Sequence, residues 1–362
     1  MIIGSVKENL DLEKRVAITP EISKKYKTLG LEICLAKNYG MHLGFTDQDY
    51  LKEGVEILEN DSDVISKSNI ILQLTMLSDE NIKLIKSEQT LIGVLDPYKN
   101  KEKIKNLSEK KVNCFSLELL PRITRAQAMD ILSSQANLAG YKAVIDSFAF
   151  FKKAIPMMMT AAGTISAAKV LVVGAGVAGL QAIATAKRMG AIVFATDVRL
   201  ASKEQVESLG GKFLTVEGSE DLETEGGYAK ETSEDFKAKQ EELLKETLKK
   251  IDVVICTALI PGKKAPLIIK KDMIEVMSRG SVIYDLVASQ GGNSELTKVN
   301  EIVDVNGVKI LGEKNILNKL PISASNLYAK NIYNFINNLY DKEKKNIEIN
   351  LEDEIINKTM VK

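Results

Sequence analysis

The chain has 362 residues, of which 45% are hydrophobic, which is enough for two domains with separate cores. Its 49 basic residues balance its 49 acidic residues, so no overall charge favours nucleic acid or an anionic membrane surface. Cys34, Cys114 and Cys256 lie apart in apolar runs and have neither metal-ligand nor redox spacing. With no secretory signal pattern at the start of the sequence, these features predict a protein of a reducing cytosol.

In the first third of the chain, short apolar runs alternate with amphipathic segments. The runs predict strands over 2–6, 31–36, 70–74, 91–95 and 112–117. The amphipathic segments predict helices over 21–29, 49–56 and 99–110, the first of them preceded by Pro20. Strands that alternate with helices indicate a parallel, doubly wound sheet. No glycine fingerprint occurs here, so we expect this part to be the partner of a nucleotide-binding domain.

The segment 121–144 begins with helix-start residues and predicts a helix with one polar ridge. The ridge runs through Gln127, Asp130, Ser134 and Asn137, at steps of three and four residues. Arg122 and Arg125 lie at its head. A nicotinamide carboxamide offers one acceptor and two donor hydrogens, so Asp130 with Arg or Ser donors could orient it. A solvated helix face is the alternative.

A weakly charged stretch follows. Residues 148–168 include three consecutive methionines, and we expect them to pack between the domains, where methionine is a common core filler. The window 154–186 carries a single charge, Lys169, and is long enough to span a bilayer. Pro156 and several glycines interrupt it, and its second half fits a strand–turn–helix unit, so a soluble segment is predicted.

The most informative stretch is 169–197. An apolar, mostly β-branched run at 170–173 predicts a buried strand, and Gly174, Gly176 and Gly179 follow it with the spacing G-x-G-x-x-G. A helix is predicted over 180–189 with Gly190 as its stop, then a second strand over 192–196 that ends at Asp197. Such a turn and the helix N-terminus behind it bind a diphosphate through backbone N–H groups.

The carboxylate of Asp197 lies where an acidic residue commonly binds the ribose hydroxyls of NAD(H). Its charge would repel the additional phosphate of NADP(H), although Arg199 would soften that preference. The alternative is an ordinary strand–helix–strand unit in which the glycines serve only the turn.

The remaining elements complete a second sheet. Helices are predicted over 202–209, 233–250 and 321–340, and strands over 212–216, 253–257, 281–286 and 308–311. The acidic, glycine-containing segment 217–232 is long for a connection, so it either shelters a cofactor or is a passive insertion. The closing helix would return to the first domain. We therefore assign 1–125 plus 320–362 to one domain and 126–319 to an inserted NAD(H)-binding domain.

His42 is the only histidine and lies in a turn-like stretch far in sequence from the glycine fingerprint. A dehydrogenase that acts on an alcohol, an amine or a 2-oxo acid moves a proton with the hydride, most often through histidine. Hydride transfer between two nicotinamides needs no acid or base. Lysine, aspartate or tyrosine can replace histidine, so this observation favours direct transfer without requiring it.

Nearly the whole chain resembles one family: the soluble NAD(H)-binding part of the alpha subunit of proton-translocating NAD(P) transhydrogenase, and more distantly alanine dehydrogenase. The matching stretches are Lys7-Glu8, Arg15-Val16, Thr19-Pro20, 121–144, 157–164, 195–199, 204–213, 226–231, 257–262, Asp285-Leu286 and Gly291-Gly292-Asn293. So many matches in one order are far more specific than any single motif.

The resemblance implies an α/β fold with two Rossmann-like, doubly wound parallel-sheet domains, the NAD(H)-binding domain inserted in the first. It implies that hydride passes directly from NADH to NADP⁺ held by a partner beta subunit, coupled to proton translocation by membrane-spanning subunits. It also implies a homodimer that is cytoplasmic and peripheral on the inner face of the cell membrane.

The resemblance further implies site residues. Those at the nicotinamide end are Arg122, Gln127, Asp130 and Ser133, with Gln127 reaching toward the NADP(H)-carrying partner. Those that bind the rest of the cofactor are Gly174, Ala175, Gly176, Val177, Ala178, Gly179, Asp197, Val198, Arg199, Gly227, Tyr228, Thr257, Ala258 and Leu259. The segment 217–232 would be a mobile loop that closes over the cofactor through Tyr228. No metal is expected.

The alternative is an alanine dehydrogenase-like amino-acid oxidoreductase. Arg15 matches that family's substrate-carboxylate arginine, but its substrate lysine falls at Gln73. Its catalytic histidine falls in the histidine-free stretch 95–98, and its catalytic aspartate falls near Ser289. A sensor that binds NAD(H) without turnover is a third possibility, but it gives no reason for the set from Arg122 to Ser133.

Overall fold

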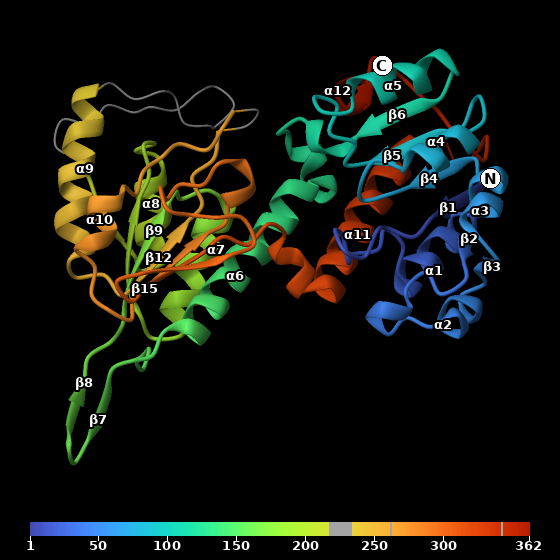
Figure 1. The fold of residues 1–362 in the computed structure, drawn as a ribbon. Coiled ribbons are helices and arrows are strands. Elements are labelled where there is room, and N and C mark those ends of the chain that lie inside the picture. Colours follow the sequence, from blue (N-terminus) through green and yellow to red (C-terminus); the bar gives the residue numbers. More distant parts are fainter. Residues whose placement is uncertain (217–233, 261–262, 342) are drawn as a thin grey trace. The chain divides into compact units, whose positions relative to one another are not determined.

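The computed structural model describes residues 1–216, 234–260, 263–341 and 343–362. The chain forms two compact units: unit 1 is Met1–Gln135 with Leu317–Lys362, and unit 2 is Ala136–Ile316 (Figure 1). The predicted α/β fold, in which one domain is inserted in the other, is confirmed. The two divisions fall within α6 (Ile131–Phe150) and η5 (Ile316–Lys319), whereas the sequence placed them at 125/126 and 319/320.

Unit 1 is built on a seven-stranded sheet of order β18-β6-β5-β4-β1-β2-β3. Its strands are β1 (Ile2–Ser5), β2 (Glu32–Ala36), β3 (Glu56–Leu58), β4 (Ile70–Leu72), β5 (Thr90–Gly93), β6 (Asn113–Ser116) and β18 (Met360–Val361). All neighbours pair in parallel except β18, which runs antiparallel to β6. The last residues of the chain therefore complete the sheet that its first residues begin.

Helices cover both faces of this sheet, as expected for a doubly wound fold. They are α1 (Pro20–Thr28), α2 (Asp47–Lys52), α3 (Asp61–Lys67), α4 (Asp79–Leu84), α5 (Lys101–Glu109), α11 (Pro321–Leu339) and α12 (Glu354–Thr359). On one face α1 and α11 bury Tyr26 and Phe335 against the strands. On the other, α3 and α5 bury Val64 and Leu107. Short 3₁₀ turns are η1 (Met41–Leu43), η2 (Leu117–Leu119) and η3 (Thr124–Met129), and a small hairpin pairs β16 (Tyr340–Asp341) with β17 (Asn346–Ile347).

One predicted helix of unit 1 is too long. The helix expected over 49–56 is α2, which starts earlier because Thr46 and Asp49 form a capping box. It stops at Lys52, before Gly54 takes a left-handed conformation with φ of 75°. The last predicted residue, Glu56, instead begins β3. The prediction missed this edge strand because it is short and half-buried.

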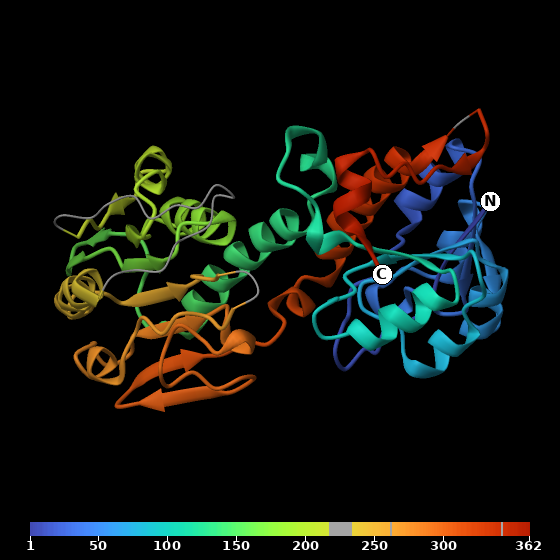
Figure 2. The same cartoon turned by 90° about the horizontal axis from the view of Figure 1, so that it is seen from above.

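Unit 2 carries a second seven-stranded sheet, of order β11-β10-β9-β12-β13-β15-β14. Its strands are β9 (Lys169–Val173), β10 (Ile192–Thr196), β11 (Lys212–Phe213), β12 (Val253–Cys256), β13 (Val282–Asp285), β14 (Ile302–Val305) and β15 (Val308–Leu311). All pair in parallel except the edge strand β14, which runs antiparallel to β15 (Figure 2, orange).

The helices of unit 2 are α7 (Val177–Arg188), α8 (Ser202–Ser208), α9 (Glu234–Leu248) and α10 (Lys271–Glu275), with the 3₁₀ turn η4 (Ala288–Gln290) and the C-terminal part of α6. Leu244 and Leu248 of α9 pack with Met273 of α10 on one face of the sheet. Helix α7 packs on β9, β10 and β12. A Cβ at Gly140 of α6 would lie 2.0 Å from the Ala178 carbonyl oxygen, so α6 and α7 are in close contact.

The methionine-rich segment is not core, and that prediction is wrong. Residues 158–165 form a hairpin of β7 (Met158–Thr160) and β8 (Gly163–Ile165), which projects from the rest of unit 2 (Figure 1). Its apolar side chains are exposed: Met158 by 45%, Met159 by 79% and Ile165 by 44%. The prediction of burial relied on apolar composition alone. It failed because these residues form a short two-stranded hairpin with Gly163 at its turn. None of the described helices is long and apolar enough to cross a membrane.

Candidate functional site

The glycine-rich turn connects β9 to α7 and is held by close backbone packing. Gly174 has φ of 92°, a conformation that side chains disfavour. A Cβ at Gly179 would lie 1.9 Å from the carbonyl oxygen of Gly174, so the helix lies directly on the turn. The helix starts at Val177, three residues before the predicted Leu180. Its N-cap residue is Gly176, so no side chain caps the helix. The turn therefore has the shape predicted from the glycine spacing.

The middle glycine faces open space. A Cβ built on Gly176 would meet no protein atom within 4 Å, unlike one on either neighbouring glycine of the motif. Behind it, α7 offers the N–H groups of its first turn, and a helix of this length carries partial positive charge there. The space beside Gly176 is the position at which the glycine spacing predicts a diphosphate.

Asp197 follows β10 and lies beside the turn. Its carboxylate accepts hydrogen bonds from the Ala175 N–H at 2.7 Å, from the Arg199 N–H at 2.9 Å and from the Arg199 guanidinium at 2.8 and 2.9 Å. Burial alone raises the pKa of Asp197, but these hydrogen bonds outweigh it, and the pKa is lowered. Val198 lines a narrow hollow with Asp197, at the C-terminal ends of β10 and β11.

The loop after β12 lies at the same edge of the sheet as the glycine-rich turn. The hydroxyl of Thr257 donates to the carbonyl of Gly174 at 2.9 Å and lies 3.1 Å from that of Val173. Ala258 follows, and Leu259 is 38% exposed. Glycine turn, Asp197 and this loop therefore meet at the carboxyl ends of parallel strands, where open α/β sheets bind ligands.

Asn293, which was not among the predicted site residues, holds this loop. Its fully buried amide accepts from the N–H of Ala258 at 2.9 Å and donates to the carbonyls of Ala258 and Pro266 at 2.9 and 2.8 Å. The side chain thus pairs with Ala258 as a neighbouring strand would. The signal for it in the sequence is Gly291-Gly292-Asn293, one of the stretches that match the family.

The carboxylate of Asp285, at the end of β13, fixes the segment that carries Asn293. It accepts from the N–H groups of Val287 and Ser294 at 3.2 and 3.0 Å and from the hydroxyl of Thr297 at 2.7 Å. Burial raises the pKa of Asp285. The hydrogen bonds of Asp285 and Asn293 therefore connect the end of β13, through residues 293–294, with Ala258.

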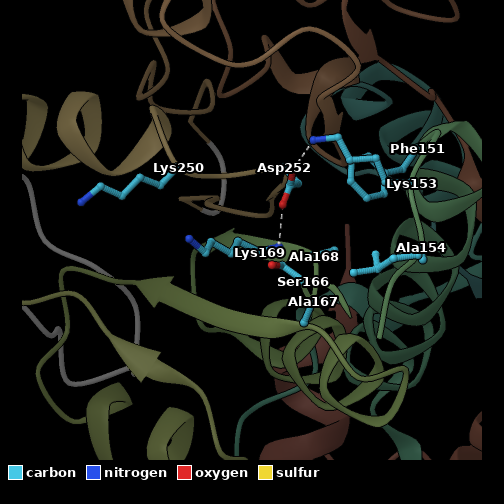
Figure 3. Close-up of a pocket in the computed structure, with 10 residues that line it drawn as sticks. Phe151, Lys153, Ala154, Ser166, Ala167, Ala168, Lys169, Lys250 and Asp252 are labelled. Carbon is cyan, nitrogen blue, oxygen red and sulfur yellow. Dashed lines mark hydrogen bonds and ion pairs between the residues drawn. The ribbon is translucent and has the colours of Figure 1, made fainter. Parts of the chain in front are cut away.

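A pocket of about 530 Å³ lies at the other end of the sheet in unit 2 (Figure 3). It is lined by Lys169 at the start of β9 and by Asp252, the residue before β12. Asp252 accepts from the Lys169 N–H at 2.9 Å and pairs with Lys153 at 3.2 Å. Because the glycine turn follows the opposite end of β9, this pocket is separate from the predicted dinucleotide site.

The predicted nicotinamide residues belong to unit 1, and their secondary structure differs from the prediction. The segment 124–129 is the 3₁₀ turn η3, and α6 begins only at Ile131. Asp130 between them has an extended backbone, with ψ of 94°. The prediction of one continuous helix with a polar ridge from Gln127 to Asn137 is therefore wrong. The physical reason is that Asp130 caps the helix instead of continuing one.

The carboxylate of Asp130 accepts hydrogen bonds from the N–H and the hydroxyl of Ser133 at 2.9 and 2.5 Å. The side chains of Arg122 and Gln127 are exposed, while Ala126 and Met129 are buried in the core of unit 1. Two of the predicted residues, Asp130 and Ser133, are thus in direct contact. Gly227 and Tyr228 lie outside the described residues.

Unit 1 also contains a polar cluster around Arg15. The guanidinium donates to the Glu13 carboxylate through Nε at 2.8 Å and Nη2 at 2.7 Å, and through Nη1 to Gln135 at 2.8 Å. Gln73 is 2% exposed, accepts from Ser5 and Val6, and donates to Glu8 at 3.1 Å. His42 lies in η1, where its ring meets the Lys14 carbonyl at 2.7 Å. The described residues contain no cluster of acidic, His and Cys side chains suited to a metal ion.

Comparisons with known proteins agree with this architecture. Family models described as the N-terminal and C-terminal domains of alanine dehydrogenase/PNT match residues 4–139 and 143–362. The chain therefore belongs to the alanine dehydrogenase/PNT family, an α/β oxidoreductase family.

Within this family the transhydrogenase branch is the better match. The chain is 47% identical to the first portion of NAD(P) transhydrogenase subunit alpha from Rhodospirillum rubrum, over 100% of this chain and 96% of that one. The solved transhydrogenase of Sinorhizobium meliloti superposes with a TM-score of 0.88 at 42% identity, over 99% and 98% of the chains. An alanine dehydrogenase of Methanococcus maripaludis is 26% identical over 82% of this chain and 74% of its own. The predicted enzyme class, an NAD(P) transhydrogenase alpha subunit, is thereby confirmed.

Proposed function

We propose that this chain binds NAD(H) in unit 2 and takes part in direct hydride transfer from NADH to NADP⁺ held by a separate beta subunit. The observation that carries the binding step is the open space at Gly176, the N-cap of α7. When bound, the nicotinamide supplies the hydride. The chain's own residues bind and orient it.

The proposed roles follow from the chemistry of each group. The first turn of α7 binds the diphosphate through its N–H groups. Asp197 accepts from the ribose hydroxyls, and its charge disfavours a 2′-phosphate. Thr257, Ala258 and Leu259 form the wall of the site, and Gly227 and Tyr228 complete it. Arg122, Gln127, Asp130 and Ser133 act at the nicotinamide end, where Asp130 and Ser133 offer both an acceptor and a donor to the carboxamide.

Direct transfer explains why the chain needs no proton shuttle. The only histidine, His42 in η1, is hydrogen-bonded to the backbone carbonyl of Lys14. Two properly oriented nicotinamide rings react through positioning alone, which holds the reacting atoms together. Coupling to proton translocation then belongs to membrane-spanning partner subunits.

An amino-acid oxidoreductase is the second candidate, and the Arg15 cluster argues against it. Two edges of the Arg15 guanidinium already bind Glu13 and Gln135. Gln73, at the position of the substrate lysine, is neutral and bonded to Ser5, Val6 and Glu8. A substrate acid would find neither a free lysine nor a shuttle there.

The experiment that tests the function has three arms. NADH binding is measured on the chain by fluorescence titration. Transhydrogenation is then followed with and without an added NADP(H)-binding subunit. The last arm replaces that subunit by pyruvate and ammonia. We expect binding in the first arm, turnover only with the partner in the second, and no steady NADH loss in the third. Steady NADH loss with pyruvate would instead establish the amino-acid oxidoreductase, and binding with no turnover would establish a sensor.

We also propose that the chain is a homodimer, peripheral on the cytoplasmic face of the membrane through its partner subunits. The β7–β8 hairpin supports the dimer, because an isolated two-stranded hairpin with exposed methionines is marginally stable in water. A second copy of the chain would cover it. Light scattering on the wild type and on Met157→Ser/Met159→Ser should show a dimer and a shift toward monomer; a wild-type monomer at micromolar concentration would overturn this proposal.

A further inference from the structure

The turn η3 carries Gln127 and lies between Arg122 and Asp130, which are also proposed to act on nicotinamide. A 3₁₀ turn has poorer hydrogen-bond geometry than an α-helix and is not held by a sheet. Ala126 and Met129 anchor it on its inner side, where they are 2% and 6% exposed. Gln127, and Arg122 two residues before the turn, are exposed. The position of those two side chains therefore depends on whatever fixes the backbone around them.

One fixing contact comes from the C-terminal end of the chain. Arg125 of η3 forms a two-bond ion pair with Asp353, with Nη1–Oδ2 and Nη2–Oδ1 distances of 2.8 and 2.6 Å. Asp353 is also the N-cap of α12, where Oδ1 accepts from the Ile355 N–H at 2.8 Å. Helix α12 is itself fixed, because Ile355 and Ile356 are buried in the core of unit 1.

A second contact comes from α11. The side-chain amides of Asn331 and Asn334 both donate to the carbonyl of Ala128 at 2.9 Å. They lie one helical turn apart and so present the same face. Asn331 also accepts from the hydroxyl of Ser134 at 2.6 Å, just past the cap of α6. The two contacts lie on either side of Gln127 in the sequence.

We infer that Arg125, Asp353, Asn331 and Asn334 are positioning residues: they hold η3 so that Arg122, Gln127 and Asp130 keep the geometry that hydride transfer requires. This inference rests on the proposed function. The Arg125–Asp353 pair is partly exposed, at 53% and 15%, so it contributes little to global stability. Its two parallel hydrogen bonds nevertheless define orientation as well as distance.

The test uses the full chain with its NADP(H)-binding subunit and four variants. Arg125→Gln removes one partner of the pair. Asp353→Asn removes the other while keeping an N-cap residue for α12. The third variant combines both substitutions. Lys103→Gln is the matched control, because it breaks the Lys103–Asp79 ion pair, which has a length of 2.7 Å and also joins two elements of unit 1.

We expect each of the first three variants to lower kcat about tenfold, because small displacements of positioned groups are costly in rate. NADH affinity should stay within about twofold, since the dinucleotide wall is in unit 2. The double variant should be no slower than the single ones. Backbone amides of residues 124–130 should exchange hydrogen faster in all three, and Lys103→Gln should match the wild type.

The outcomes separate this inference from the proposed function. Wild-type kcat and wild-type exchange in Arg125→Gln would overturn the positioning role while leaving the function intact. Multiplicative losses in the double variant would also overturn it, because they mean that the two residues act separately. A wild-type chain without transhydrogenation would overturn the proposed function, and the inference with it.

Discussion

Ala175 donates its N–H to Oδ2 of Asp197 at 2.7 Å, so the carboxylate after β10 is bonded directly to the glycine-rich turn after β9. The acidic residue and the glycine-rich turn are thus one hydrogen-bonded unit. The Arg199 guanidinium covers the same carboxylate from the other side. Ribose hydroxyls that donate to the Asp197 carboxylate would therefore compete with the Arg199 guanidinium for its oxygens, as well as with water.

Asp197→Asn should weaken NADH binding about 10- to 100-fold, because hydrogen bonds to a charged group are lost. NADPH should lose less, since the repulsion of its phosphate disappears with the charge. Fluorescence titration of both nucleotides measures the ratio. An unchanged preference for NADH would show that Asp197 does not select the cofactor.

The stability of the fold should depend on pH through the ionisation of Asp197. The lowered pKa of Asp197 means that its ionised form stabilises the fold above the ordinary carboxyl pKa, and that this contribution disappears as the pH falls through the lowered value. The Tm of the wild type should exceed that of Asp197→Asn by a constant amount between about pH 8 and 5, and the gap should narrow below about pH 4. Thermal unfolding across this range provides the measurement.

Two glycine substitutions should have separable effects. Gly176→Ala places its methyl group in space that no protein atom occupies, so the Tm should change little while NADH binding is largely lost. Gly179→Ala drives a methyl group into the carbonyl of Gly174, so both the Tm and binding should fall. Calorimetry with and without NADH distinguishes them. Tight NADH binding by Gly176→Ala would contradict the assigned diphosphate position.

Asn293→Ala should destabilise the chain by about 1–3 kcal/mol, because it leaves the N–H and carbonyl of Ala258 without their partner. NADH affinity should fall as well, since the loop at Thr257 loses its support. Asn137→Ala is the control, because the amide of Asn137 makes one exposed contact, to Gln181 at 3.1 Å. Denaturant unfolding should separate the two variants, and equal effects would refute a special role for Asn293.

Arg122→Ala and Asp130→Asn should each slow hydride transfer about tenfold or more with the fold intact. Asparagine retains an acceptor for the Ser133 N–H, so α6 keeps its cap. Circular dichroism checks the fold, and transhydrogenation with the partner subunit checks the rate. Wild-type rates in both variants would remove these residues from the proposed site.

The sequence predicted the fold closely where the local signals were strong. The central strand β9 and the stop at Gly190 lie where the apolar run and the glycine placed them. Where two signals conflicted, the prediction failed. Asp130 fits a helix by spacing but acts as a cap, and Met158 and Met159 are apolar but lie on an exposed hairpin.

Long-range partners were beyond the reach of sequence patterns. Asn293 meets Ala258 across 35 positions, and Arg125 meets Asp353 across 228. Nothing in the local periodicity around either residue indicates its partner, because the contact depends on how separate strands and helices come together. The sequence therefore predicted the glycine-rich turn but not these long-range side-chain partners.

The return of the chain to unit 1 has a consequence for biosynthesis. Helix α11 buries Tyr328 and Phe335 in a core that also contains side chains of β1, β2 and α1, and β18 pairs with β6. A ribosome releases all of unit 2 before it releases these pieces. While unit 2 is synthesised and folds, the N-terminal part of unit 1 therefore lacks α11 and β18. One apolar face of its sheet is then uncovered, and the edge of β6 is unpaired. Nascent chains halted before α11 should consequently be the ones that recruit chaperones.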